Sequence, residues 1–420
     1  MKFLLFDIFI CWVLISCSNS YYVTPVQYGA FPDGKTDCTE PIQRMLHDMK
    51  INKIYKAKFP AGNYLISDGF TIDFPCSIIG NNATVITQDT LGCKYAFNYS
   101  LSNKGDFEPN KKQTELSLNF KIHGVPVAFH GYNNIYMHDC NVSTFTGTDT
   151  YYKNTKFWFA INCDRMYDAH FKNIHFDQPV NYRKNQFNSA DGLHITGLCH
   201  DIIIDHLTGI CGDDFVALNA NEDTPGDIYN ITIRNCIMGD TLTKNGIRIY
   251  GTARGNSCAI SNILIEKCTI RSDNSPCIYF TNSANGVYNK EASLLQVENI
   301  LVRKCKFYAP KFELASGDHP SVIRIAGVNG ENIKFEKIKG FSNKDSMTYF
   351  LNILDKSNIK NLTLKKCSLK GKKSLSFLKY NGINPSDNDA CIFIEKCKFN
   401  RDDAMRYIYD YKDNKRQKLY

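Results

Sequence analysis

One short pattern of polar and apolar positions recurs along the chain. A polar residue, usually Asn, is followed by apolar and polar residues in alternation and then by Cys. Because successive side chains of a strand point to opposite faces, this alternation predicts a β-strand with one buried face. The clear copies are NIYMHDC (134–140), YNITIRNC (229–236), NILIEKC (262–268), NILVRKC (299–305), NLTLKKC (361–367) and CIFIEKC (391–397).

The copies repeat at a nearly constant interval. Weaker copies fill the gaps between the clear ones, and the last positions of successive copies lie 29 to 37 residues apart. A strand at this period, with no helical pattern between copies, predicts a solenoid in which equivalent strands stack. The weaker copies are AHFKNI (169–174), DIIIDHL (201–207) and NIKFEKI (332–338).

A second series of strand-like segments alternates with the first. Two such series joined by turns predict a parallel β-helix, whereas a propeller would need four strands per repeat and tight hairpin turns. The segments are KFWFAIN (156–162), DGLHITG (191–197), DFVALNA (214–220), NGIRIYG (245–251), PCIYFTN (276–282), SVIRIAG (321–327), YFLNILD (349–355) and LSFLKYN (375–381).

A helix is expected in front of the strands. The segment TDCTEPIQRMLHDMK (36–50) has capping residues, an early Pro and apolar residues at helical spacing. A solenoid needs its open end covered, so we expect this helix to close the barrel mouth. The predicted fold class is all-β, a single-stranded right-handed parallel β-helix with a short N-terminal capping helix.

The cysteines fit this arrangement without disulfides. The chain has 17, and six of them occupy the last position of the repeated pattern. A disulfide framework is the default in an exported protein. A recurring inward position beside Ile and Leu instead suits a small apolar side chain, and free Cys serves as one. We therefore expect these six cysteines to be buried and mostly reduced.

The N-terminus predicts export. The segment MKFLLFDIFICWVLISC places an apolar run between Lys2 and Cys17, and it is too short and too poorly flanked to span a membrane. The string LISC resembles the lipobox of bacterial lipoproteins, which implies lipidation of Cys17 and anchoring to a membrane of the bacterial cell envelope. The alternative is ordinary secretion. The expected division is a signal peptide (1–16), a cap (17–50), a catalytic β-helix (51–400) and a basic tail (401–420).

Charge adds little to this picture. The formal net charge is +8, which suits an acidic partner, although a Lys-rich composition alone could produce it. We expect a monomer without a nucleic-acid partner.

Three aspartates are the strongest candidates for chemistry. Aligning DGLHITG with DFVALNA makes Asp191 equivalent to Asp214, one turn of the solenoid away. Adjacent turns lie about 4.8 Å apart, so Asp191 is expected beside Asp213 and Asp214. Clustered carboxylates raise one another's pKa, so one can act as an acid while its neighbours act as bases. This is the apparatus for cleaving a glycosidic bond; a calcium site is the alternative.

These motifs resemble glycoside hydrolase family 28, the polygalacturonases and their relatives. The family has Asn-Thr-Asp followed one turn later by Gly- or Gln-Asp-Asp; here Asp191 matches the first motif's aspartate and Gly212-Asp213-Asp214 matches the second. The N-terminal segments YGAFPDGKTDCTEPIQ (28–43) and FPAGNYLI (59–66) also resemble the start of sequences of the wider pectate-lyase-like β-helix superfamily. The resemblance spans roughly residues 22–300. It implies an inverting hydrolase in which Asp213 is the general acid while Asp191 and Asp214 activate water.

Two family features are absent from the sequence. Asn245 stands where the family has the His of Gly-His-Gly, and GIRIYGT (246–252) resembles the family's Gly-x-Arg-x-Lys-Thr with Tyr250 in place of Lys. We expect Arg248 to bind substrate, because Ile247 and Ile249 point inward and leave it outward. His194 occupies the same outward position in its strand as Arg248 does in its own, and it is a candidate for the missing imidazole. Asn245 and Tyr250 complete the expected substrate-binding set.

The expected substrate follows from the arginine. A guanidinium beside the aspartates suits an acidic sugar, so a uronic-acid polysaccharide such as a pectic chain is the leading expectation. We expect no cofactor and no metal. The alternatives are a metal-dependent polysaccharide lyase, with Arg248 as the base, and a β-helix that only binds glycan.

Overall fold

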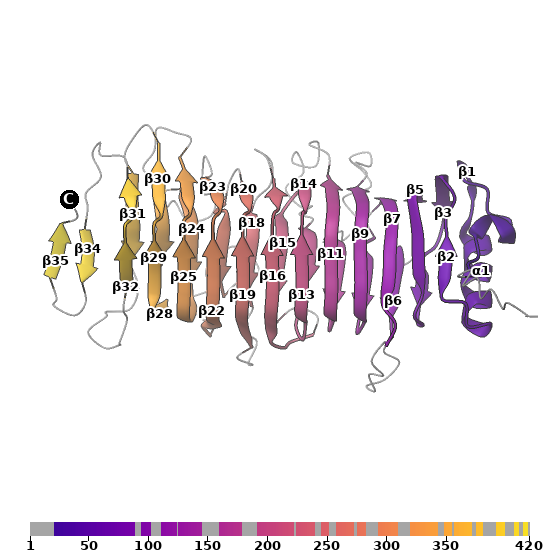
Figure 1. The fold of residues 1–420 in the computed structure, drawn as a ribbon, viewed down its shortest axis with the longest axis horizontal. Coiled ribbons are helices and arrows are strands. Elements are labelled where there is room, and N and C mark those ends of the chain that lie inside the picture. The colour runs from indigo at the N-terminus through magenta and orange to yellow at the C-terminus, as the bar shows by residue number, and fades with distance from the viewer. Residues whose placement is uncertain are drawn as a thin grey trace, which may run out of the picture.

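The chain forms a long solenoid of stacked parallel strands with a helix at its N-terminal end (Figure 1). This computed structural model describes residues 21–88, 94–101, 111–123, 125–144, 159–178, 191–221, 224–239, 245–251, 258–272, 275–282, 293–309, 320–342, 348–354, 357–371, 375–380, 392–399, 407–410 and 415–418. The expected signal peptide (1–16) and Cys17 lie outside these residues.

The first of two large sheets has 22 strands and contains every copy of the repeated Asn-to-Cys pattern. Most turns of the solenoid contribute one longer and one shorter strand to it. Its strands are β1 (Asp33–Asp37), β2 (Lys56–Lys58), β3 (Gly62–Ile66), β5 (Ser77–Thr87), β7 (Thr114–Ile122), β9 (Asn133–Thr144), β11 (Tyr167–Asp177), β13 (His200–Asp205), β14 (Thr208–Ile210), β16 (Ile228–Arg234), β17 (Ile237–Met238), β19 (Ala259–Glu266), β20 (Thr269–Arg271), β22 (Leu295–Arg303), β23 (Lys306–Tyr308), β25 (Val328–Glu336), β26 (Lys339–Phe341), β28 (Asn358–Lys360), β29 (Leu362–Lys365), β30 (Ser368–Lys370), β32 (Ile392–Glu395) and β33 (Lys398–Phe399).

The second sheet has 11 strands and corresponds to the second series of segments in the sequence. Among the described residues, the strand pairings along both sheets are parallel, which confirms the β-helix and excludes a propeller. Sequence patterning missed the first three strands of this sheet. Its strands are β4 (Phe70–Ile72), β6 (Phe97–Ser100), β8 (Val127–His130), β10 (Phe159–Asp164), β12 (Asp191–Ile195), β15 (Asp214–Asn219), β18 (Asn245–Tyr250), β21 (Ile278–Thr281), β24 (Ser321–Ala326), β27 (Thr348–Ile353) and β31 (Leu375–Tyr380).

The expected cap is present. Helix α1 (Thr39–Ile51) follows the short 3-10 helix η1 (Pro25–Tyr28), and it buries Ile42, Met45 and Met49 in the same core as the first strands. Figure 1 shows α1 at the N-terminal end of the solenoid. Strand β1 lies before α1 in the chain yet pairs with β3, so the sheet begins within the segment expected to be only a cap.

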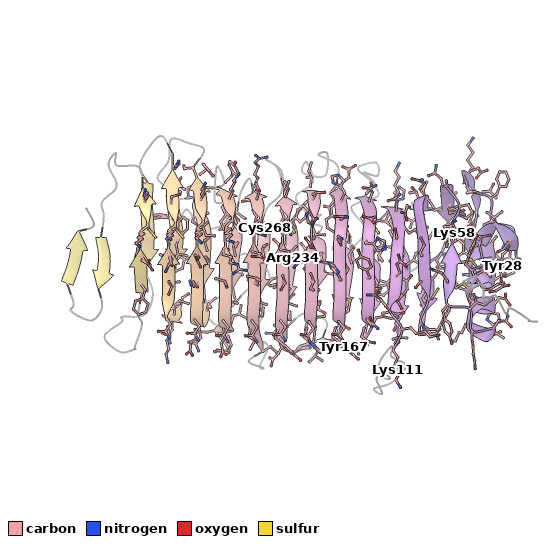
Figure 2. All side chains as sticks on the ribbon, in the orientation of Figure 1. Tyr28, Lys58, Lys111, Tyr167, Arg234 and Cys268 are labelled. Carbon is pink, nitrogen blue, oxygen red and sulfur yellow. The ribbon has the colours of Figure 1, made fainter. Side chains whose placement is uncertain are left out.

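The six cysteines of the repeated pattern point to the interior, as expected. Cys140, Cys236, Cys268, Cys305 and Cys367 are buried and free, and Cys397 is free and partly buried. The strand registers place Cys236, Cys268 and Cys305 at equivalent positions of successive turns, and Cys268 is labelled in Figure 2. Burial raises the pKa of the Cys140 thiol to about 12, so this sulfur behaves as a small apolar group.

Two corners of each turn explain the polar residues of the pattern. The Asn that opens a copy adopts a left-handed backbone conformation, for example at Asn262 and Asn299, and Asn tolerates this better than most residues. The Asn299 side chain donates to Asn262 Oδ1 (3.1 Å), and this ladder continues through Asn332 and Asn361. The residue before Cys, such as Lys304, is also left-handed. This second corner turns the Cys inward.

The C-terminal end differs from the rest of the solenoid. Strands β34 (Tyr407–Asp410) and β35 (Lys415–Lys418) form an antiparallel pair within the segment expected to be a basic tail.

Among the described residues, no helix is both long and apolar enough to cross a membrane.

Candidate active site

The candidate site lies where three neighbouring strands of the second sheet begin. Asp191 opens β12, Asp214 opens β15 and Asn245 opens β18. The register pairs Leu193 with Val216, which makes Asp191 and Asp214 equivalent positions, and it pairs Asp214 directly with Asn245. The expected stacking of the aspartates on adjacent turns is therefore confirmed.

Both oxygens of Asp191 are held in place. His194 Nδ1 donates to Asp191 Oδ2 (2.7 Å), and the main-chain N–H of Asp214 donates to Asp191 Oδ1 (3.0 Å). Asp191 and His194 are buried, and the His194 ring lies 3.9 Å from the Phe159 ring. Burial raises the pKa of the Asp191 carboxyl, and Asp213 adds to this rise, whereas the contact with His194 opposes it.

Asp214 is the most deeply buried of the three aspartates. Asn245 donates its side-chain N–H to Asp214 Oδ1, and Arg248 lies 3.5 Å from Asp214 Oδ2. The Asp214 side chain is buried away from water, and this desolvation raises the pKa of its carboxyl well above the usual range. Repulsion from Asp213 acts in the same direction, and the attraction to Arg248 does not overcome the two effects.

Asp213 completes a compact group of carboxylates. One oxygen from each of Asp191, Asp213 and Asp214 lies within 4.8 Å of the others. Asp213 is half-buried, so among the three it has the side chain most accessible to a large substrate. The oxygens are close enough together to bind one cation with ligand distances of about 2.3–2.6 Å. However, Arg248 already supplies a positive charge beside Asp214, which disfavours a second cation there.

The substrate-binding residues expected from the sequence meet at the same place. Arg248 is paired with Ala217 and points away from the core, because its neighbours Ile247 and Ile249 are buried in it. The guanidinium carbon of Arg248 lies 4.3 Å from the centre of the Tyr250 ring. The centres of the Tyr250 and His194 rings lie 6.5 Å apart. The position beside Asp214, where the family resemblance led us to expect an imidazole, is occupied by Asn245. His194 does not lie there and contacts Asp191 instead.

Close packing under the aspartates explains one glycine. A Cβ on Gly192, directly after Asp191, would lie 2.7 Å from Cys211 Sγ and 2.7 Å from the carbonyl oxygen of Phe215. A larger residue would therefore push the two aspartate-bearing strands apart. The sequence DG at 191–192 thus serves the packing of the site rather than a tight turn.

Gln178 is a site residue that sequence reasoning missed. It is buried, its side-chain N–H donates to the carbonyl oxygen of Asp191 (3.4 Å), and its Oε1 accepts from the N–H of Gly212. It therefore joins the chain just before Asp213 to the chain at Asp191. No repeated pattern marks this residue, because its role depends on a contact between two turns.

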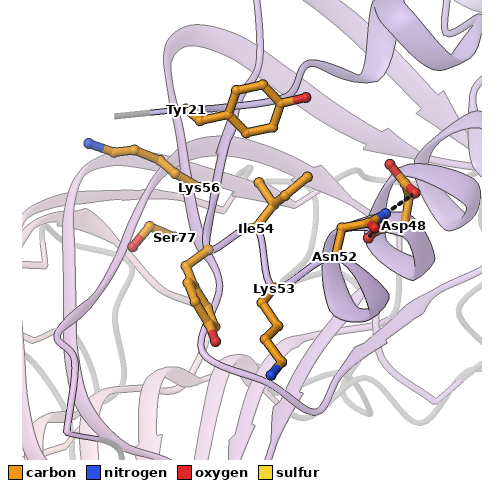
Figure 3. Close-up of a pocket in the computed structure, with 8 residues that line it drawn as sticks. Tyr21, Asp48, Asn52, Lys53, Ile54, Lys56 and Ser77 are labelled. Carbon is orange, nitrogen blue, oxygen red and sulfur yellow. Dashed lines mark hydrogen bonds between the residues drawn. The ribbon is translucent and has the colours of Figure 1, made fainter. Parts of the chain in front are cut away.

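A separate open pocket of about 650 Å³ lies at the N-terminal cap (Figure 3). Tyr21, Asp48 and Lys53 are among its lining residues, and none of the aspartates of the candidate site contributes to it. In Figure 1 helix α1 of the cap lies at one end of the solenoid, whereas strand β15 lies near its middle. The pocket is therefore not part of the candidate site.

Comparisons with known proteins identify a family. The sequence matches the profile of Glycosyl hydrolases family 28 over residues 131–391, more than half of the chain, whereas no curated protein matches it. The match includes all three aspartates; it starts later than the resemblance seen in the sequence and extends further toward the C-terminus.

Solved structures share the fold at low sequence identity. The Streptococcus pneumoniae surface protein and adhesin PfbA is 14% identical, with a TM-score of 0.63 over 91% of this chain and 98% of that one. The Yersinia enterocolitica family 28 exopolygalacturonase is 11% identical, with a TM-score of 0.55 over 90% and 78%. The catalytic domain of a GH87 α-1,3-glucanase in complex with nigerose is 12% identical, with a TM-score of 0.57 over 92% and 69%.

These identities are too low for the solved structures to indicate more than the fold. The profile match carries the assignment, and it covers the turns that bear the aspartate group. The chain belongs to glycosyl hydrolases family 28.

Proposed function

We propose that the protein is an inverting glycoside hydrolase that cleaves a uronic-acid-containing polysaccharide of the pectic type. The observation that carries the proposal is the group of three carboxylates on adjacent turns with a guanidinium beside it. Membership of family 28 supports hydrolysis of a glycosidic bond. The exopolygalacturonase among the structures of the same fold is consistent with the substrate class.

The electrostatics of the site support acid–base catalysis. The raised pKa values of Asp191 and Asp214 mean that these two carboxylates, when ionised, are stronger bases than separate aspartates would be, which suits them to taking a proton from water. Asp213 is the half-buried member, so we assign it the transfer of a proton to the leaving oxygen. Asp191 and Asp214 then hold and activate the attacking water.

The hydrogen bonds around the buried aspartates favour direct attack by water. Inverting enzymes usually separate their carboxyl groups by about 6.5–9.5 Å and retaining enzymes by about 5–5.5 Å. An inverting mechanism calls for the wider range, but one oxygen from each of the three carboxyl groups lies within 4.8 Å of the others. Distance alone therefore does not support inversion. Both oxygens of Asp191 are engaged, as are both of Asp214, which makes either a poor covalent nucleophile.

Arg248 is assigned to the substrate. Its guanidinium is held between Asp214 and the Tyr250 ring, so it is oriented before a substrate arrives. A planar guanidinium binds a carboxylate through two parallel hydrogen bonds. The sugar at the cleavage point is therefore expected to carry a carboxylate.

A non-catalytic glycan-binding β-helix is the second candidate. The fold shared with the PfbA adhesin favours it. However, a binding module has little reason to stack three carboxylates, because their mutual repulsion costs stability. A metal-dependent lyase is the third reading, and the closeness of the three carboxylate oxygens favours it.

One set of assays separates these readings. Purified protein is incubated with polygalacturonate, other pectic polysaccharides and a neutral glucan, while reducing ends and ultraviolet absorbance are followed with and without chelator. A hydrolase releases reducing ends without absorbance and retains activity in chelator. An unsaturated, absorbing product that chelator suppresses would identify a lyase, and binding without any product would identify a binding module.

A further inference from the structure

A strip of positive charge lies on the first sheet, in the C-terminal half of the solenoid. It consists of the ends of five long strands and the short strands that follow them, and we call it the basic strip. The short strands β20, β23, β26, β30 and β33 pair with one another in this order. Figure 1 shows β20, β23 and β30 one after another along the upper edge of the solenoid. The basic strip comprises residues 266–271, 303–308, 336–341, 365–370 and 395–399.

The basic strip concentrates the positive charge of the chain. It contains 12 Lys and Arg residues but 3 Glu, whereas the whole chain has 50 Lys and Arg against 42 Asp and Glu, a formal net charge of +8. A generally Lys-rich composition would have placed more carboxylates here. The strip thus carries about as much net positive charge as the entire chain.

One exposed lysine per turn forms the centre of the basic strip. Each occupies the left-handed corner before the inward Cys position, where the earlier turns have Asn173 and Asn235. Asn tolerates this conformation better than Lys, so the backbone does not account for the lysines. At the turn spacing of about 4.8 Å they form a row about 19 Å long. The five are Lys267, Lys304, Lys337, Lys366 and Lys396.

The glutamates of the basic strip do not neutralise it. Glu266 pairs with Arg303 (2.8 Å) and Glu395 pairs with Lys365 (2.8 Å). Glu336 lies within 3.5 Å of the ammonium groups of two lysines. Most cations of the strip therefore remain in excess, and rows of like charge destabilise the folded state by mutual repulsion. A bound polyanion would remove this repulsion.

Two aromatic rings lie within the same strip. Tyr308 on β23 and Phe341 on β26 are half-buried and stacked, with ring centres 4.9 Å apart, and the Arg271 guanidinium carbon lies 4.6 Å from the centre of the Tyr308 ring. On the same outward side of these two strands, Lys306 and Lys339 are exposed. The apolar face of a sugar ring can pack on such aromatic rings while its carboxylate reaches the neighbouring lysines.

We propose that the basic strip is a second, non-catalytic binding site for a linear acidic polysaccharide, in which carboxylates of successive sugars contact lysines of successive turns. The turn spacing of about 4.8 Å is comparable to the length of one sugar residue in an extended chain. The inference goes beyond the proposed function, because the strip belongs to the first sheet and the three aspartates lie at strands of the second. Binding here holds the protein on an acidic polymer whether or not the polymer is cleaved.

A regular polysaccharide fits the basic strip better than a nucleic acid or a membrane. Phosphates along one strand of DNA are about 3.4 Å apart, which does not match the row of lysines. A fluid bilayer presents no fixed spacing. Among the described side chains of the strip, none of the large apolar ones is exposed for insertion into a bilayer.

The test measures binding of polygalacturonate by calorimetry in an Asp213→Asn/Arg248→Ala parent, in which the candidate active site neither cleaves nor holds the polymer firmly. The variant Lys304→Gln/Lys337→Gln/Lys366→Gln removes three charges on successive turns of this parent. An exposed ion pair contributes about 2- to 5-fold in affinity, so the variant should raise the Kd about 10- to 100-fold. Added salt should weaken binding more in the parent than in the variant.

Two further variants of the same parent control for charge and folding. Replacing the same three lysines with Arg keeps the charge and should leave the Kd within about 2-fold of the parent value. The matched control removes three charges from the N-terminal end, where Lys53 is also left-handed and all three lysines are exposed. This control, Lys35→Gln/Lys53→Gln/Lys111→Gln, should bind polygalacturonate as the parent does.

The outcomes separate this inference from the proposed function. An unchanged Kd in the strip variant, or an equal loss in the N-terminal control, would overturn the inference. Wild-type protein that binds phosphatidylglycerol vesicles but not polygalacturonate would also overturn it and identify a membrane as the partner. Strip-dependent binding by a wild type that hydrolyses no polygalacturonate would support the inference and reject the proposed function.

Discussion

Replacing Asp214 with Asn is expected to make the folded protein more stable at neutral pH while it removes activity. The pKa of the Asp214 carboxyl is raised well above its usual range, so the folded site as a whole disfavours its negative charge. A neutral side chain of the same shape removes that penalty. Sites that are arranged for catalysis are often less stable than their inactive variants.

The distances give the size of the effect. At an effective dielectric constant of about 20, the attraction to Arg248 at 3.5 Å is about 5 kcal/mol, and repulsion between charges 4.8 Å apart is about 3.5 kcal/mol for each of the other two aspartates. These repulsions add to the desolvation of the buried Asp214 carboxylate, which is the largest cause of its raised pKa and opposes the charge even while Asp213 holds the catalytic proton. We therefore expect Asp214→Asn to gain about 1–2 kcal/mol in the free energy of unfolding at pH 7.

The gain should depend on pH in a defined direction. Because the folded pKa is raised, the folded wild type binds its proton more tightly than the unfolded chain. The wild type therefore becomes more stable as the pH falls from the folded pKa toward about 4, the ordinary value for Asp. The advantage of Asp214→Asn should be largest at pH 7 and disappear near pH 4.

A second buried aspartate supplies the matched control. Burial alone would raise the pKa of Asp205, but hydrogen bonds from Asn235 and Arg234 (2.9 Å each) hold it below its usual range. Asp205→Asn should therefore lose stability at pH 7, and this loss should fade as the pH falls through the folded pKa of Asp205. Urea denaturation of the three proteins across this pH range measures both effects. Destabilisation by Asp214→Asn at pH 7, or a gain independent of pH, would refute the reasoning.

The remaining predictions concern substrate binding, the fold and anchoring. Arg248→Ala should raise KM on polygalacturonate by about 10-fold or more, with a smaller effect on a neutral glycan; equal effects in initial-rate assays would exclude a carboxylate contact. Asn299→Ala should lower the free energy of unfolding by about 1–2 kcal/mol, because Ala tolerates the left-handed corner poorly and loses the ladder contact, whereas Asn299→Gly should lose less. We also propose that Cys17 is lipidated, so Cys17→Ala should move the protein from the membrane fraction to the soluble one; identical fractionation of both forms would favour secretion.

The sequence was sufficient to predict the fold because every turn repeats the same physical requirement. Each strand of the first sheet, such as β19 or β22, needs apolar residues at alternate positions and a small residue where the chain turns inward. These requirements produce a visible period. Strands β4, β6 and β8 were missed because they are only three or four residues long, too short to show a clear alternation of apolar and polar residues.

The site could be predicted only in part. Asp191, Asp214 and Arg248 were located because each falls at a fixed place within a repeated strand, and the register then brings them together. Gln178 was not, because its contacts with Asp191 and Gly212 join two turns that the sequence does not align. The pairing of His194 with Asp191 was also unforeseen, since side chains three positions apart in a regular strand point to opposite faces.

The most direct test of the account is the rate of polygalacturonate hydrolysis by Asp213→Asn, with the configuration of the product followed by NMR in the wild type. Loss of general acid catalysis costs about 10²- to 10⁴-fold in rate, so kcat should fall by that factor while the melting temperature is no lower than that of the wild type and the substrate affinity stays near the wild-type value. The first product of the wild-type enzyme should have the inverted anomeric configuration. Wild-type activity in Asp213→Asn would contradict the assigned acid, and a retained configuration would contradict direct attack by water.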